Sequence, residues 1–181
     1  MTADDLSALL ARVEDADDVE RAGLVEQVRG HPGLAAATAG EAFIAAALLS
    51  DYGAVPDLPQ AVALAERAHE EGVDRAGLLY AMCTDKLSLY SGRPQPYGTV
   101  TVEHQGELVQ PPVDPSTTDD ERAALGVEPL AQLQQAAEQA NRQRAAARAS
   151  EPVALSYGQP FARVWTDPSP EELRTRAESE G

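Results

Sequence analysis

The first 90 residues carry apolar side chains at helical spacing almost without interruption. Leu6, Leu9, Leu10 and Val13 recur at intervals of three and four residues, which places them on one face of a helix. Aromatic residues make up only 4% of the chain, so the core must be built from Ala, Leu and Val. Small aliphatic side chains let helices pack closely. We therefore expect a mainly α fold, a compact helical domain.

Two more helices are predicted before the middle of the chain. One runs from about Asp17 to Arg29 and is stopped by the sequence Gly30-His31-Pro32-Gly33. The next, from about Glu41 to Asp51, contains the run FIAAALL and is apolar on nearly all sides. A helix with this pattern is surrounded by other elements. It is predicted to be the central buried helix.

The segment 57–92 predicts a helical hairpin, with a turn at Gly72. Small residues stand where its two helices must approach, at Ala61, Ala65, Ala68 and Ala76. This pattern resembles one unit of the Sel1 and tetratricopeptide class of helical repeats. The sequence contains no second copy at the corresponding period, so a solenoid is not supported.

The composition changes after residue 92. The run TVTVEHQGELVQ alternates with period two around Gln105-Gly106, which predicts a small β-hairpin near 98–110. Thr118 and Glu121 have the spacing of a capping box at the start of a short helix. A long polar helix is predicted from about Pro129. Together these elements define a helical domain over residues 1–150.

Residues 151–181 are rich in proline and glycine and predict an irregular C-terminal extension. Two short extended pieces between residues 153 and 165 include Trp165, the only tryptophan. A last short helix is expected to begin at Ser169. Because burial of a large aromatic ring favours packing, we expect this extension to pack on the helical domain.

The formal charge of -16 limits the partners of this protein. Nucleic-acid backbones and anionic membranes attract basic patches, so we expect neither as a partner. The remaining partners are a small molecule or a protein, and the oligomeric state stays open. Lys86 is the single lysine among arginines, a bias that suggests GC-rich bacterial coding.

The cysteine count and the N-terminus indicate where the protein resides. Cys83 is the single cysteine, which excludes an internal disulfide and fits a reducing compartment. No signal sequence or long apolar span is apparent, so we expect a cytoplasmic protein. His31, His69 and His104 lack metal-ligand spacing, and no phosphate- or dinucleotide-binding motif occurs, so neither a metal nor a cofactor is expected.

The middle of the chain resembles a family of bacterial proteins defined only as a domain of unknown function. The resemblance rests on Asp85, Gly92, the segment Gln95-Pro96-Tyr97-Gly98-Thr99 and the stretch PPVDPSTTDDERAALGVEPL. It covers roughly residues 20 to 135 and is more specific in the second half. Members of the family have a helical N-terminal half, and the resemblance implies no particular reaction.

The match can be followed residue by residue. Asp85 stands at the family's Asp, but Lys86 replaces the neighbouring Arg, and Val100 stands where the family repeats Gln. At the end of the third helix the family has a His, whereas this chain reads Ser50-Asp51-Tyr52. Loss of that histidine implies a lost or changed activity if it is functional in relatives. The other matching positions are Gln95, Tyr97, Gly98, Thr99, Asp114, Pro115, Asp119, Arg122, Gly126, Pro129 and Leu130.

These residues predict one candidate polar site. Asp85 or His104 would act as the base, and Tyr97 as the acid or hydrogen-bond donor. Arg122 would clamp an anion, and the candidate ligand-binding set is Gln95, Asp119 and Arg122. The structural alternative is that Asp85 pairs with Arg122 or caps a loop, that Tyr97 packs its ring, and that His104 is a solvated turn residue.

Two functions follow from this site. The first is a non-catalytic helical module that binds a small ligand or a protein in a groove formed by the 57–92 hairpin and the 93–122 segment. The second is a small cofactor-free enzyme of bacterial metabolism that uses acid-base chemistry in the same groove. No motif in the sequence names a reaction, so both remain open.

Overall fold

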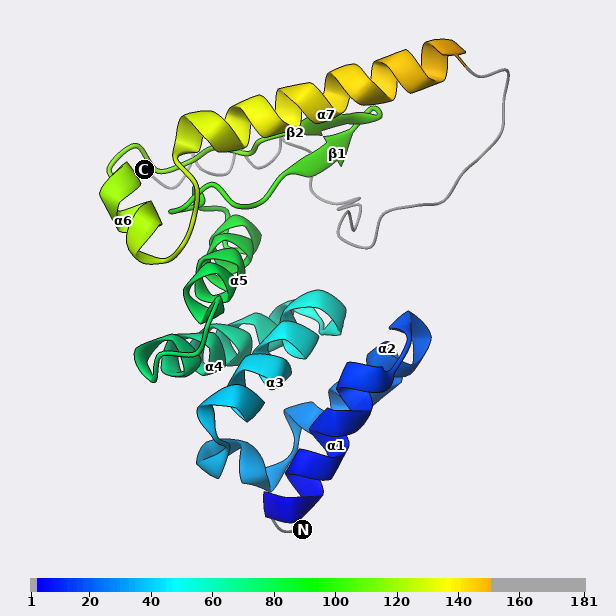
Figure 1. Cartoon of the computed structure of the whole chain (residues 1–181), viewed down its shortest axis with the longest axis vertical. Helices are drawn as coiled ribbons and strands as arrows, with labels where there is room; N and C mark the ends of the chain where they lie inside the picture. Colours follow the sequence, from blue (N-terminus) through cyan, green and yellow to red (C-terminus); the bar gives the residue numbers. More distant parts are fainter. Residues whose placement is uncertain (1–2, 151–181) are drawn as a thin grey trace.

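The chain forms a series of helices, then a hairpin, then two more helices. The computed structural model describes residues 3–150, and Figure 1 shows the helices from the N-terminus at one end to the hairpin and α7 at the other. The helices are α1 (Ala3–Asp15), α2 (Asp18–Arg29), α3 (Ala39–Tyr52), α4 (Leu58–Glu70), α5 (Ala76–Tyr90), α6 (Asp119–Ala124) and α7 (Leu130–Ser150), with short 3-10 helices η1 (Pro32–Ala36) and η2 (Val55–Asp57) and strands β1 (Val102–His104) and β2 (Glu107–Val109). The predicted mainly α fold with one small hairpin is confirmed.

Helix α3 is the centre of the N-terminal half. It contacts α1, α2, α4 and α5. Ala42, Ala45 and Leu49 are fully buried on it, and Leu48 is nearly so. An apolar helix loses contact with water only when it is surrounded in this way. The prediction of a central buried helix is confirmed.

Polar side chains fix where several helices begin. The Asp17 carboxylate accepts hydrogen bonds from the backbone N–H groups of Val19 and Glu20, both at 2.9 Å. Thr118 and Glu121 form the predicted capping box at the start of α6, and Thr38 and Glu41 form a further one at α3. Each box satisfies backbone N–H groups that lack a partner inside the helix.

Helices α4 and α5 form the predicted helical hairpin. The small residues Ala61, Ala65, Ala68 and Ala76 are completely buried, and α4 and α5 pack against each other. The turn between them uses Gly72, whose φ of 81° is a left-handed conformation that glycine adopts readily.

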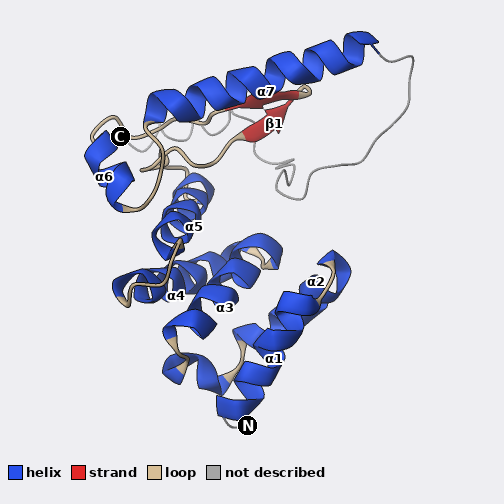
Figure 2. Ribbon diagram, viewed as in Figure 1, coloured by secondary structure: helices blue, strands red, loops and turns tan. Residues whose placement is uncertain are grey.

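Strands β1 and β2 pair antiparallel, with Val102 opposite Val109 and His104 opposite Glu107. Gln105 and Gly106, with φ values of 51° and 82°, make the predicted two-residue turn. Figure 2 shows α7 lying along this hairpin. The Asn141 side chain joins the two elements: its oxygen accepts from the Leu108 N–H at 2.7 Å and its amide donates to the Leu108 carbonyl at 2.8 Å.

Helix α2 ends at Arg29 with Gly30 as its C-cap, so the predicted stop is confirmed. The stretch that stops it leads directly into the short helix η1, which was not predicted from the sequence, because His31 caps η1 and Pro32 occupies its first position. The His31 ring nitrogen Nδ1 accepts from the Gly33 N–H at 3.1 Å. Proline suits this position since its φ is already helical.

The predicted C-terminal extension, with its strand pieces between 153 and 165 and its helix from Ser169, lies outside the described residues. Within residues 3–150, none of the helices combines the length and the apolar composition that crossing a membrane requires.

Close packing of the alanines gives the first testable expectation. We expect Ala65→Leu to lower the free energy of unfolding by about 1–3 kcal/mol, because a larger side chain has no room in the core. The matched control is Ala63→Leu on the exposed side of α4, where a change within about 0.5 kcal/mol is expected. Urea unfolding measures both. Equal losses in the two variants would contradict the packing described here.

Candidate functional site

Most of the predicted site residues meet where α5, the 93–101 loop and α6 come together, a region called here the α5 junction. Asp85, on α5, is completely buried. One oxygen of its carboxylate accepts the Tyr97 N–H at 2.8 Å. The other accepts the Thr99 N–H and the Thr99 hydroxyl, both at 2.7 Å. Asp85 thereby holds the loop on the helix, as in the predicted alternative in which it caps a loop.

Gln95 closes the base of the hairpin. Its side chain is completely buried. The amide nitrogen donates to the carbonyls of Val100 and Pro111 at 3.1 and 3.2 Å, and the amide oxygen accepts from the Val100 N–H at 3.0 Å. The Gln95 backbone also forms an isolated parallel bridge with Val113. Only a side chain with both donors and an acceptor satisfies all of these groups.

Arg122, on α6, is 2% exposed. Its Nε donates to the Tyr97 carbonyl at 3.0 Å, and its Nη1 donates to the Thr117 carbonyl at 2.9 Å and to Asp119 at 3.1 Å. The same Asp119 oxygen accepts the Leu130 N–H at 3.0 Å, at the start of α7. Arg122 and Asp119 therefore join the loop to α6 and α7.

The peptide groups of Tyr97 link Asp85 to Arg122. Asp85 accepts the Tyr97 N–H and Arg122 donates to the Tyr97 carbonyl. Among the described residues, no direct ion pair joins Asp85 to Arg122, as the sequence alternative had it; both bind the main chain of Tyr97 instead. The next residue, Gly98, has a φ of 81°, and a Cβ there would lie 3.0 Å from the side chain of Leu130. The segment around Tyr97 is fixed on both sides.

The Tyr97 side chain packs against Tyr80 of α5. The ring centroids are 6.4 Å apart and the planes are tilted by 55°, an arrangement that aromatic pairs favour. Tyr97 is half-buried. Burial raises the pKa of its hydroxyl, and the neighbouring Tyr80 raises it further. The hydroxyl therefore stays protonated at neutral pH and can donate or accept a hydrogen bond.

Burial also raises the pKa of Asp85, while the hydrogen bonds from Tyr97 and Thr99 act in the opposite direction. A raised pKa is typical of acid-base residues but also of buried structural carboxylates. In Asp85 both oxygens are occupied by groups of the loop and no part of the side chain reaches solvent.

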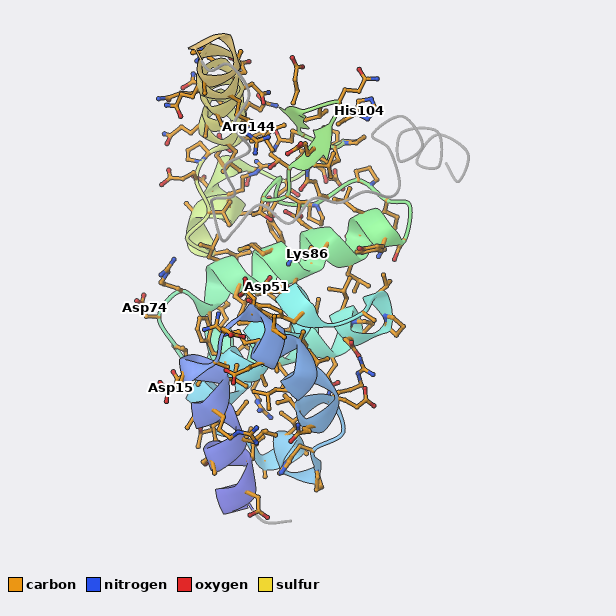
Figure 3. The ribbon with its side chains drawn as sticks, turned by 90° about the vertical axis from the view of Figure 1, so that its right-hand side faces the viewer. Asp15, Asp51, Asp74, Lys86, His104 and Arg144 are labelled. Carbon is orange, nitrogen blue, oxygen red and sulfur yellow. The ribbon has the colours of Figure 1, made fainter. Side chains whose placement is uncertain are left out.

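His104 has a different environment. It ends β1 beside the hairpin turn and is only partly buried. Figure 3 shows it on the hairpin, in the same part of the molecule as Arg144 of α7. Among the hydrogen bonds of the described residues, none joins His104 to Asp85, Gln95, Tyr97 or Arg122, which are brought together without it.

Sequence reasoning missed a second polar cluster, between α3 and α5. The Lys86 ammonium donates to the Ser50 hydroxyl at 2.9 Å, to the Ser50 carbonyl at 3.1 Å and to Asp51 at 2.9 Å. Figure 3 shows Asp51 and Lys86 close together. Lys86 and Asp51 are 35 residues apart in the chain, so no local sequence signal links them.

Comparisons with protein-family models, curated proteins and solved structures found no match. The resemblances to the family of unknown function and to the Sel1 and tetratricopeptide repeats therefore stay predictions. In the part of the chain that the structure describes, no three His, Cys, Asp or Glu side chains are grouped as metal ligands.

The geometry of Asp85 yields a second testable expectation. Asp85→Asn replaces one acceptor by an amide that faces backbone N–H groups, so we expect the free energy of unfolding to fall by about 1–3 kcal/mol. Asp74→Asn, an exposed acid in the turn before α5, is the matched control and should change stability little. Chemical denaturation of both variants tests this. Full stability in Asp85→Asn would remove the capping role.

Proposed function

We propose that the protein is a non-catalytic helical module that binds a small ligand or a protein in a groove between the 57–92 hairpin and the 93–122 segment. The observation that carries this proposal is that the Asp85, Gln95 and Arg122 side chains form hydrogen bonds with backbone groups of the loop. These hydrogen bonds hold the loop in one position and so support a fixed surface. A rigid surface favours binding, because less entropy is lost when a ligand is held.

The alternative, acid-base catalysis in the same groove, has less support. A general base must come within hydrogen-bond distance of the proton it removes. Asp85 is completely buried and its carboxylate already accepts three hydrogen bonds. His104, the other candidate base, belongs to the hairpin. Among the described residues, no hydrogen bond joins it to the α5 junction. Neither residue offers a base beside the Tyr97 hydroxyl.

Tyr97 and Tyr80 are the proposed contact surface. Both are half-buried, so each has a packed edge and an accessible edge. Tyrosine is favoured in binding sites because its rigid ring contributes large contact area and its hydroxyl contributes one directed hydrogen bond. The backbone of Tyr97 is fixed by Asp85 and Arg122, which keeps the ring in position before a ligand arrives.

The proposal is tested by dialysing the protein against a bacterial metabolite extract and identifying retained compounds by mass spectrometry. We expect a retained compound to be recovered chemically unchanged, and Tyr97→Phe to weaken its affinity about tenfold. The same substitution should change the free energy of unfolding by less than about 1.5 kcal/mol.

The matched control is Tyr52→Phe, which removes the tyrosine hydroxyl at the end of α3 that donates to Asp18, and should leave this affinity unchanged. Conversion of the compound to a product would favour the enzyme instead. Equal affinities of the original protein and Tyr97→Phe would place the ligand elsewhere.

A further inference from the structure

Helices α1, α2 and α3 lie at the end of the molecule opposite the hairpin (Figure 1). Residues of these three helices line a cavity. Its volume is about 290 Å³, at the lower limit of the range typical of sites for small organic molecules. None of its lining residues belongs to the α5 junction. The cavity is therefore a separate candidate site, beyond the function proposed above.

The floor of the cavity is apolar. It is formed by Val13 of α1 and by Phe43, Ile44, Ala47 and Leu48 of α3. Phe43 and Ile44 line the cavity and are only partly buried, so each keeps some apolar surface exposed to solvent. A ligand with a hydrocarbon body would remove this surface from water, at about 25 cal/mol per Å².

The rim of the cavity carries more negative than positive charge. Its carboxylates are Glu14, Asp18 and Asp51, and Arg21 is its only cation among the described lining residues. Lys86 of α5 pairs with Asp51 at 2.9 Å. After both cations are counted against the three carboxylates, one negative charge remains.

Arg21 is directed at the end of α1. Its Nε donates to the Val13 carbonyl at 3.1 Å and its Nη2 to the Glu14 carbonyl at 3.3 Å. These carbonyls belong to the last turn of the helix, where cations are favoured by the helix dipole. The Tyr52 hydroxyl donates to the Asp18 carboxylate. The pKa of Arg21 is raised, chiefly by its hydrogen bond with Tyr52, so this guanidinium remains charged.

We propose that this cavity binds a small protonated amine that carries an apolar body. The hydrocarbon part would lie on Phe43 and Ile44, and the ammonium would lie at the rim near Glu14 and Asp18. The faces of Phe43 and Tyr52 also attract cations. The net charge of -16 raises the local concentration of cationic ligands around the whole protein.

An anionic ligand of the same shape fits less well. Arg21, the cation on the rim, donates to main-chain carbonyls of α1, and Lys86 pairs with Asp51 from outside the cavity. A carboxylate bound in this cavity would share its lining with Glu14, Asp18 and Asp51. Repulsion between like charges disfavours such binding.

Isothermal titration calorimetry with two matched probes tests the proposal. We expect 2-phenylethylammonium to bind with a Kd of about 1 mM or tighter. We expect 3-phenylpropionate, a carboxylate of similar size, to bind about tenfold more weakly. Added salt should weaken binding of the amine. Equal binding of the two probes, or no binding of the amine at millimolar concentration, would overturn the proposal.

Variants locate the site. Glu14→Gln should weaken amine binding about threefold or more, because a rim charge is lost, and Ala47→Leu should abolish it by filling the cavity. Asp15 is next to Glu14 in the sequence (labelled in Figure 3) but does not line the cavity, so Asp15→Asn should leave amine binding unchanged. An equal loss in Asp15→Asn and Glu14→Gln would reduce the effect to general charge and overturn the assignment.

A folding control is needed for Ala47→Leu, because a misfolded variant would also lose binding. Circular dichroism and thermal unfolding establish whether this variant is folded. If it is not, the amine affinity of Glu14→Gln decides the test. Tyr97→Phe should bind the amine with unchanged affinity. Its failure to do so would relocate the amine to the α5 junction, so the two proposed sites are tested independently.

Discussion

The carboxylate of Asp85 holds the second half of the molecule on the first. Among the described residues after 92, the buried hydrophobic side chains are Val100, Val102 and Val127. Val100 and Leu89 of α5 form a small apolar cluster at this end, against the extensive core around α3. The loop that leads to the hairpin is held by hydrogen bonds to Asp85, Gln95 and Arg122 instead. In a region screened from water, such bonds are stronger and any unmade bond is costly.

The two candidate sites follow from this contrast. Around α3, small side chains pack densely but leave an apolar cavity where α1 and α2 meet it. At the α5 junction the interior is polar and Asp85, Gln95 and Arg122 hydrogen-bond to the loop, although Arg122 Nη2 has no hydrogen-bond partner among the described residues. The partly exposed tyrosines remain for contact with a ligand. The first region supports recognition by shape and charge, and the second supports recognition by aromatic rings and hydroxyls.

Much of the fold could be predicted, because helix periodicity, capping boxes and the Gln105-Gly106 turn are local signals. The residues of the α5 junction could be selected from the sequence, but not their partners. Asp85 binds backbone N–H groups of Tyr97 and Thr99, and which groups those are depends on the path of the loop. The cavity could not be predicted either, since its volume depends on how three helices cross.

The double contact on Tyr97 has a mechanical consequence. The Tyr97 N–H donates to Asp85 of α5, and the Tyr97 carbonyl accepts from Arg122 of α6. The two helices therefore bind the two consecutive peptide groups that flank Tyr97. A displacement of α6 is therefore transmitted to α5 through the buried Arg122 side chain, the main chain of Tyr97 and the buried Asp85 carboxylate. The Tyr97 ring moves with this main chain, so its orientation reports the position of α6 relative to α5.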